Sequence, residues 1–96
     1  MKAYRHLVKH ALSKGYVVSV WDGEVWEVQR SGKLKEIIEC IESVEEAELK
    51  IRRVDGEQVG WAMVSAYGLE DDETVMDWSD TEWMTDWFAT YEETLK

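Results

Sequence analysis

Two Asp-Gly dipeptides, each between runs of β-prone residues, constrain the fold of this chain more than any other feature. They are Asp22-Gly23 and Asp55-Gly56. A two-residue hairpin turn needs positive φ at both central positions, and Asp-Gly is among the pairs that adopt this conformation most readily. The dipeptides therefore predict two β-hairpins, over residues 16–30 and 48–66.

The first turn also predicts a register, with Val20 opposite Val25 and Ser19 opposite Trp26. The segments around the two turns are alike, as a duplicated ββα unit would make them. We favour the simpler interpretation that Asp-Gly-Glu is a common turn solution, because turn chemistry strongly constrains composition.

Helical periodicity accounts for the rest of the regular structure. Apolar residues recur at i, i+3, i+4 and i+7 over residues 2–14, 33–43 and 80–94, which predicts three helices. Gly15 follows the first helix at the position of a left-handed C-cap. Ser31 is the predicted N-cap of the second helix.

The start of the third helix carries two further signals. Ser79 and Glu82 match a capping box, in which each side chain accepts a hydrogen bond from the other residue's backbone N–H. Trp78 and Trp83 lie at the two positions of a hydrophobic staple. We therefore expect the helix to begin directly after Ser79.

The predicted order of elements is α-ββ-α-ββ-α, with residues 68–78 as a loop. A four-stranded antiparallel sheet packed with helices is the economical architecture for this order. A folded chain of 11.2 kDa buries about 65% of its unfolded surface, which is enough for one core and too little for two. We therefore expect a single acidic α+β domain over residues 1–96.

Several features predict the compartment. No apolar run approaches the roughly 18–20 residues of a membrane span. The basic start of the chain is not followed by the apolar stretch of a signal peptide. The single cysteine, Cys40, cannot form an internal disulfide, which favours a reducing compartment. We therefore expect a cytoplasmic protein that does not contact membranes.

The formal net charge of −10 is distributed unevenly. Residues 1–21 hold four cations and no acid, whereas residues 69–96 hold ten acids and one cation. Such an excess of acid disfavours direct binding to nucleic acid and favours a basic partner. The sequence leaves open whether the basic first helix docks against the acidic C-terminal region and neutralises part of it.

No motif supports an enzyme. The chain has no phosphate loop, Gly-rich dinucleotide motif or nucleophile elbow, so we expect no cofactor and no catalytic residue. Cys40 falls late in its predicted helix, where the helix dipole raises the pKa of a thiol, which favours a structural role.

Two weaker patterns have both a binding and a structural interpretation. His6 and His10 share a helix face and are weak candidates for a metal site, but Lys9 beside them favours a solvated basic face.

A basic patch with Trp61 across the second hairpin could hold a single strand of nucleic acid. The 21 acids of the chain argue against this and favour an internal cation–π contact. The cations of this patch are Lys50, Arg52 and Arg53.

The strongest pattern is a run of carboxylates and aromatic side chains in the C-terminal third. The four acids that open it lack the alternate oxygen ligands and turn glycine of a calcium loop. One helix cannot hide all of the aromatics, so we expect some to be exposed as interface anchors beside the acids. The candidate partner-binding residues are Glu70, Asp71, Asp72, Glu73, Asp77, Trp78, Asp80, Glu82, Trp83 and Asp86.

In general character, and in the tract Asp77–Phe88, the chain resembles the small acidic proteins of bacteriophages and mobile elements that inhibit host nucleic-acid-binding proteins, some by imitating DNA. The resemblance implies a non-catalytic inhibitor or adaptor that occupies a basic protein surface. The basic first helix departs from full DNA mimicry.

Two alternatives remain open. One is an oligomeric structural or assembly protein, a homodimer for example, with surplus Trp buried between subunits. The other is a small metal-binding or enzymatic domain built on His6 and His10.

Overall fold

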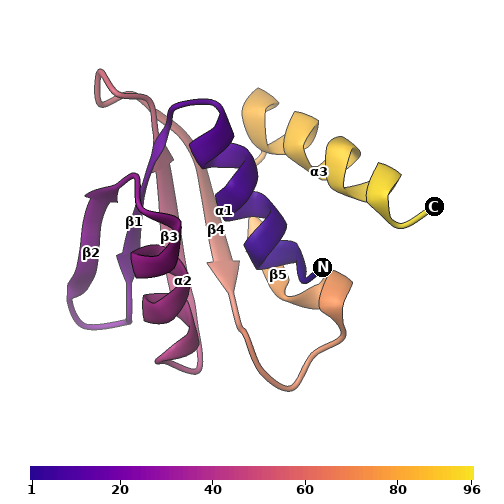
Figure 1. Ribbon diagram of the computed structural model, residues 1–96, viewed down its shortest axis with the longest axis horizontal. Helices are drawn as coiled ribbons and strands as arrows, with labels where there is room; N and C mark the ends of the chain where they lie inside the picture. The colour runs from indigo at the N-terminus through magenta and orange to yellow at the C-terminus, as the bar shows by residue number, and fades with distance from the viewer.

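The computed structural model describes residues 1–96, and the chain folds as an α+β structure with three α-helices and one five-stranded antiparallel sheet. The elements in chain order are α1 (Ala3–Ser13), β1 (Val17–Trp21), β2 (Trp26–Ser31), α2 (Leu34–Glu42), β3 (Ala47–Arg52), β4 (Gln58–Val64), the 3-10 turn η1 (Asp71–Glu73), β5 (Val75–Trp78) and α3 (Glu82–Thr94). The strand order is β2-β1-β3-β4-β5. Figure 1 shows α1 and α2 lying across the sheet, with α3 beside α1.

The prediction of four strands was wrong by one, because β5 lies within the expected loop at 68–78. β5 pairs with β4 at the sheet edge, with Ala62 opposite Trp78 and Val64 opposite Val75. It has four residues, of which only Val75 is fully buried. A strand this short, one residue after four consecutive acids, offers too few apolar positions to show an alternating pattern.

The predicted register of the first hairpin was also wrong. Trp21 lies opposite Trp26 and Val20 opposite Val28, with irregularities on both sides of Val20. The Asp22 carboxylate accepts hydrogen bonds from the backbone N–H groups of residues 24 and 25, at 2.8 and 2.9 Å. This side-chain contact stabilises a turn longer than two residues, which shifts every pair that follows.

The hydrophobic core lies between the sheet and its helices. Strand β3 alternates along its length, with one set of side chains buried beneath the helices and the other half-buried on the opposite face; β1 and β4 follow this pattern except that Ser19 and Val59 are also buried. The buried set from these strands includes Val18, Val20, Leu49, Ile51, Ala62 and Val64. All three helices therefore pack on one face, and the other face of the sheet is left without a helix.

The helix caps differ from the expected ones. Thr81, not Ser79, caps α3, because its Oγ1 accepts a hydrogen bond from the backbone N–H of Met84 at 3.4 Å. The Ser79 hydroxyl instead accepts a 3.0 Å hydrogen bond from Trp61 N–H in β4. At the other helix, Lys33 occupies the N-cap, and Ser31 Oγ accepts from its N–H. None of the three helices is long and apolar enough to cross a membrane.

The basic first helix does dock beside the C-terminal helix, but not through ion pairs. The Trp87 indole donates to His6, and the Tyr91 hydroxyl donates to the Met1 carbonyl at 3.2 Å. Arg5 pairs at 2.7 Å with Glu42 of α2 instead. Helix α1 therefore leaves the charge of the acidic C-terminal region unneutralised at contact distance.

Candidate functional site

A shallow groove of about 410 Å³ lies between β5, the loop before it and α3. We call it the acidic groove; its lining residues are Leu69, Asp72, Glu73, Val75, Met76, Trp78 and Phe88. Leu69 and Met76 are each 38% exposed. An apolar floor with carboxylates at its edge is suited to a protein segment that carries both apolar and basic side chains.

Aromatic packing holds the floor of the acidic groove in place. The rings of Trp78 and Phe88 are stacked with centroids 4.8 Å apart. Trp78 also meets the buried Trp87 edge-on at 6.2 Å. These contacts connect the end of β5 to the middle of α3, so both groove aromatics are supported from beneath and are half-buried.

The structure divides the predicted partner-binding residues between separate surfaces. Asp72, Glu73 and Trp78 lie in the acidic groove. Glu82, Trp83 and Asp86 line a second hollow with Arg53 and Glu57. The remaining four are outside both, since Glu70 and Asp71 lie at η1, Asp77 faces Met63 across β4–β5, and Asp80 precedes α3.

The two expected Trp anchors therefore belong to different environments. Trp83 is half-buried, and its ring lies 5.6 Å from His10 and 5.8 Å from Tyr16. It closes the C-terminal end of α1 over the core. Met84, Trp87 and Tyr91 are fully buried, as their helical spacing predicts. Trp78 alone of the two anchors borders the acidic groove.

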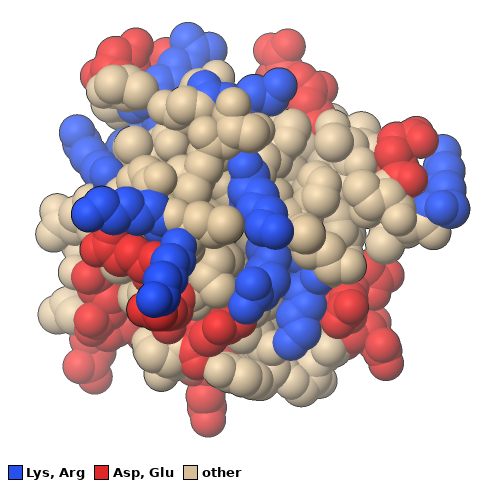
Figure 2. Space-filling model, in the orientation of Figure 1, with Lys and Arg blue, Asp and Glu red and all other residues tan.

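The acids around the groove are free of cationic partners. Of the ten acids in residues 69–96, only Glu93 forms an ion pair, with Lys96 at 3.2 Å. The other three pairs of the chain lie outside this segment. Figure 2 shows Lys and Arg side chains running down the middle of one face, over α1, with Asp and Glu gathered toward its margin. The cations of α1 thus form no ion pair with the acids of the C-terminal segment.

The histidine pair is not the solvated basic face that we expected. The rings of His6 and His10 are stacked at 6.1 Å and half-buried against α3. His6 Nδ1 accepts a 3.1 Å hydrogen bond from Trp87 Nε1, so that nitrogen is occupied. Burial lowers the pKa of both imidazoles, with nearby positive charge adding to the effect. No group of three or more His, Cys, Asp or Glu side chains is arranged to hold a metal ion.

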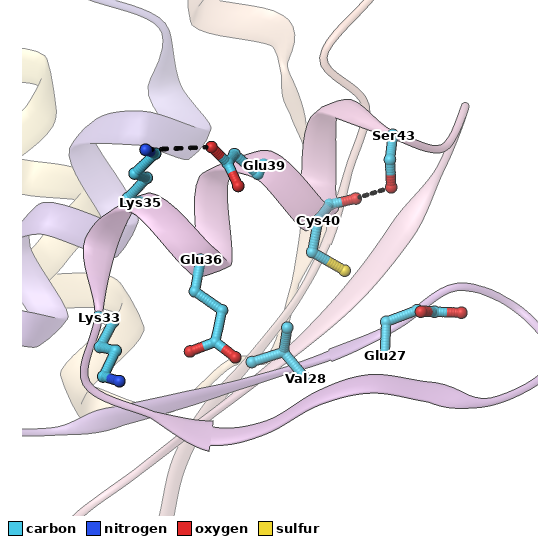
Figure 3. A pocket seen from close by; sticks show the side chains of 8 residues that line it. All are labelled: Glu27, Val28, Lys33, Lys35, Glu36, Glu39, Cys40 and Ser43. Carbon is cyan, nitrogen blue, oxygen red and sulfur yellow. Dashed lines mark hydrogen bonds and ion pairs between the residues drawn. The ribbon is translucent and has the colours of Figure 1, made fainter.

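A hollow of about 630 Å³ lies between α2 and β2 and carries mixed charges. Figure 3 shows Glu36 and Cys40 directed from α2 toward β2, where Glu27 and Val28 lie. Burial and the neighbouring carboxylates raise the pKa of the Cys40 thiol. A raised thiol pKa disfavours the thiolate that a nucleophile or metal ligand requires.

Sequence reasoning missed Leu69 and Met76 as groove residues. Both lie in the segment expected to be a loop, where an isolated apolar residue carries no periodic signal. Phe88 follows the helical spacing of the core residues of α3, but the structure places it at the core's edge, half-buried. No family model, curated protein or solved structure matches the chain.

Proposed function

We propose that this chain is a non-catalytic binding module that attaches to a basic protein surface through the acidic groove. The observation that carries the proposal is the coincidence of exposed apolar side chains, Leu69 and Met76, with unpaired acids at one site. An apolar anchor in such a groove supplies affinity, because burying its surface releases about 25 cal/mol per Å². The surrounding acids supply steering toward a cationic partner.

A nucleic-acid-binding protein is the partner class that best fits this chemistry. Its phosphate-binding surface is rich in Lys and Arg, which complement the net charge of −9 carried by residues 69–96. Occupation of that surface would inhibit or redirect the partner, as the small acidic phage and mobile-element inhibitors do. Half-burial of Trp78 and Phe88 makes the groove a preformed site.

Affinity capture with matched variants tests the proposal. The immobilised chain is compared with L69S/M76S, which keeps the charge, and with D72N/E73Q, which keeps the apolar floor. The control E45Q/E46Q removes two exposed acids from the turn after α2. We expect the parent chain and the control to retain a basic protein at low salt. Neither groove variant should retain it. Equal retention by all four chains would contradict the proposal.

A further inference from the structure

The face of the sheet without helices carries a second candidate site, of opposite charge to the acidic groove. A pocket of about 180 Å³ opens there across β1, β2 and β3. We call it the basic pocket; its lining residues are Ser19, Trp26, Gln29, Arg30, Lys50 and Arg52. Three of the six are cations and none is an acid, in a chain with 21 acids against 11 cations.

The cations of the basic pocket have no anionic partner within the chain. Arg30, Lys50 and Arg52 form none of the four ion pairs of the structure. By contrast, Arg53, the next residue along, pairs with Glu57 at 3.7 Å and lies outside the pocket. Three unpaired cations around one hollow create a local positive potential that favours an anion.

Polar groups at the base of the pocket add a hydrogen-bond donor. Ser19 is 5% exposed, and its Oγ accepts a 2.9 Å hydrogen bond from the backbone N–H of Arg30. Its own hydroxyl hydrogen donates to no protein group, so it is available to a ligand oxygen. Arg30 has a φ of 48°, a left-handed conformation that is strained for a residue with a side chain. Strain of this kind concentrates at functional sites.

Aromatic surfaces flank the cations on both sides. The Lys50 ammonium lies 4.9 Å from the centroid of the Trp26 ring, a cation–π contact that holds it at the pocket. Trp61 is the cross-strand partner of Lys50 on the next strand and is half-buried. Proteins that bind single strands combine this arrangement of backbone-contacting cations with rings on which bases stack.

We propose that the open sheet face binds a short single-stranded nucleic acid, with a backbone phosphate in the basic pocket and an adjacent base stacked on Trp61. The site is independent of the acidic groove and extends the proposed function. The net charge of −10 led us to expect no nucleic-acid contact, but local charge governs contact at a pocket, because charges farther than about 10 Å are screened at moderate salt.

Fluorescence anisotropy with a labelled short oligothymidylate tests the site. We expect binding at low salt with log K falling against log salt at a slope of about −0.7, because one backbone phosphate of a single strand is neutralised in the pocket. Arg52→Gln should weaken binding about tenfold, because it removes one of the three charged contacts to that phosphate. Trp61→Leu should weaken it about fivefold or more by loss of stacking.

Arg53→Gln is the matched control, because it removes the same charge from an exposed side chain one position away. We expect it to leave oligothymidylate affinity within twofold of the parent. The proposal is overturned if the oligonucleotide does not bind, if Arg53→Gln weakens binding as much as Arg52→Gln, or if a polyglutamate peptide of equal length binds as tightly. Circular dichroism establishes that each variant is folded.

Discussion

The indole Nε1 of Trp87 donates a 3.1 Å hydrogen bond to Nδ1 of His6, which joins residues 81 positions apart. Trp87 is 1% exposed and belongs to the core, whereas His6 is half-buried at its edge. The bond requires His6 Nδ1 to be unprotonated, because a protonated nitrogen donates and cannot accept. The contact between α1 and α3 is therefore coupled to the charge of one imidazole.

Stability should fall as the pH falls below about 6.5, the ordinary pKa of histidine. Burial lowers the pKa of His6 and His10 in the folded chain, so between that value and the lower folded pKa the unfolded chain binds more protons. Protonation then favours unfolding, and the loss is complete below the folded pKa. Urea denaturation at a series of pH values measures this dependence.

His6→Asn is the variant that isolates the contribution of His6. An asparagine carbonyl can accept from the Trp87 indole but does not titrate. We expect a smaller loss of stability between pH 6.5 and 5 than in the parent, with the remaining dependence due to His10. The depressed pKa of Glu42 acts only below about 4.5 and so lies outside this window. An unchanged pH profile would show that the pKa of His6 is the same in the folded and the unfolded chain, which contradicts the prediction.

Gly60→Ala should destabilise the chain by about 1–3 kcal/mol through overpacking. A Cβ at this position would lie 2.5 Å from Met84 Sδ and 2.7 Å from its Cγ. Met84 is flexible but fully buried, so it can move only by displacing its neighbours. Chemical denaturation measures the free energy of unfolding of each variant.

Gly32→Ala is the control for this substitution. An added Cβ there meets no atom within 4 Å, and the residue does not have positive φ. We expect a change within about 0.5 kcal/mol. If both alanine variants lose the same stability, close packing of β4 against α3 is not the reason that a glycine occupies position 60.

The sequence predicted the helices and hairpins because their apolar residues repeat with a clear period. Buried Ile37, Ile38 and Ile41 in α2 follow that pattern, and Gly15 adopts the positive φ expected after α1. β5 was missed because its pairing with β4 is a tertiary contact that four residues cannot signal. The same limit applies to the acidic groove, which forms only when β5 and α3 meet.

Side-chain hydroxyls show why the caps were assigned wrongly. Ser79 and Thr81 both precede α3, and either can accept from a helix N–H. The choice depends on Trp61 in β4, whose N–H donates to the Ser79 hydroxyl. Local sequence does not contain that partner. The basic pocket was predicted in part, since Lys50 and Arg52 belong to the basic patch of the second hairpin, whereas Arg30 joins them from β2 only through the sheet.

Thr81→Ala and Ser79→Ala should each destabilise the chain by about 1 kcal/mol, the first by loss of the cap and the second by leaving the Trp61 N–H without its partner. Glu82→Gln should change stability by less than about 0.5 kcal/mol, because no hydrogen bond joins Glu82 to Ser79. Thermal unfolding of the three variants checks this ranking. A large loss of stability in Glu82→Gln would contradict this ranking and support the predicted capping box of Ser79 and Glu82.

Arg30→Gly should stabilise the fold while removing one of the three cations of the basic pocket. The left-handed conformation of Arg30 costs roughly 1–2 kcal/mol for a residue with a Cβ, and glycine escapes that cost. Glycine also adds about 0.5–1 kcal/mol of backbone entropy to the unfolded chain, so the net gain is about 0.5–1 kcal/mol. The backbone N–H that donates to Ser19 is retained.

Arg30→Ala separates strain from charge, because it removes the same guanidinium but keeps the Cβ. We expect both variants to weaken oligothymidylate binding equally, about tenfold, since each loses one phosphate contact. Only Arg30→Gly should unfold at a higher urea concentration than the parent. The Arg30 guanidinium lies near Gly56, since a Cβ added there would be 3.7 Å from Nη1. If Arg30→Gly instead destabilises the chain, this packing of the Arg30 side chain stabilises the fold by more than the backbone strain costs.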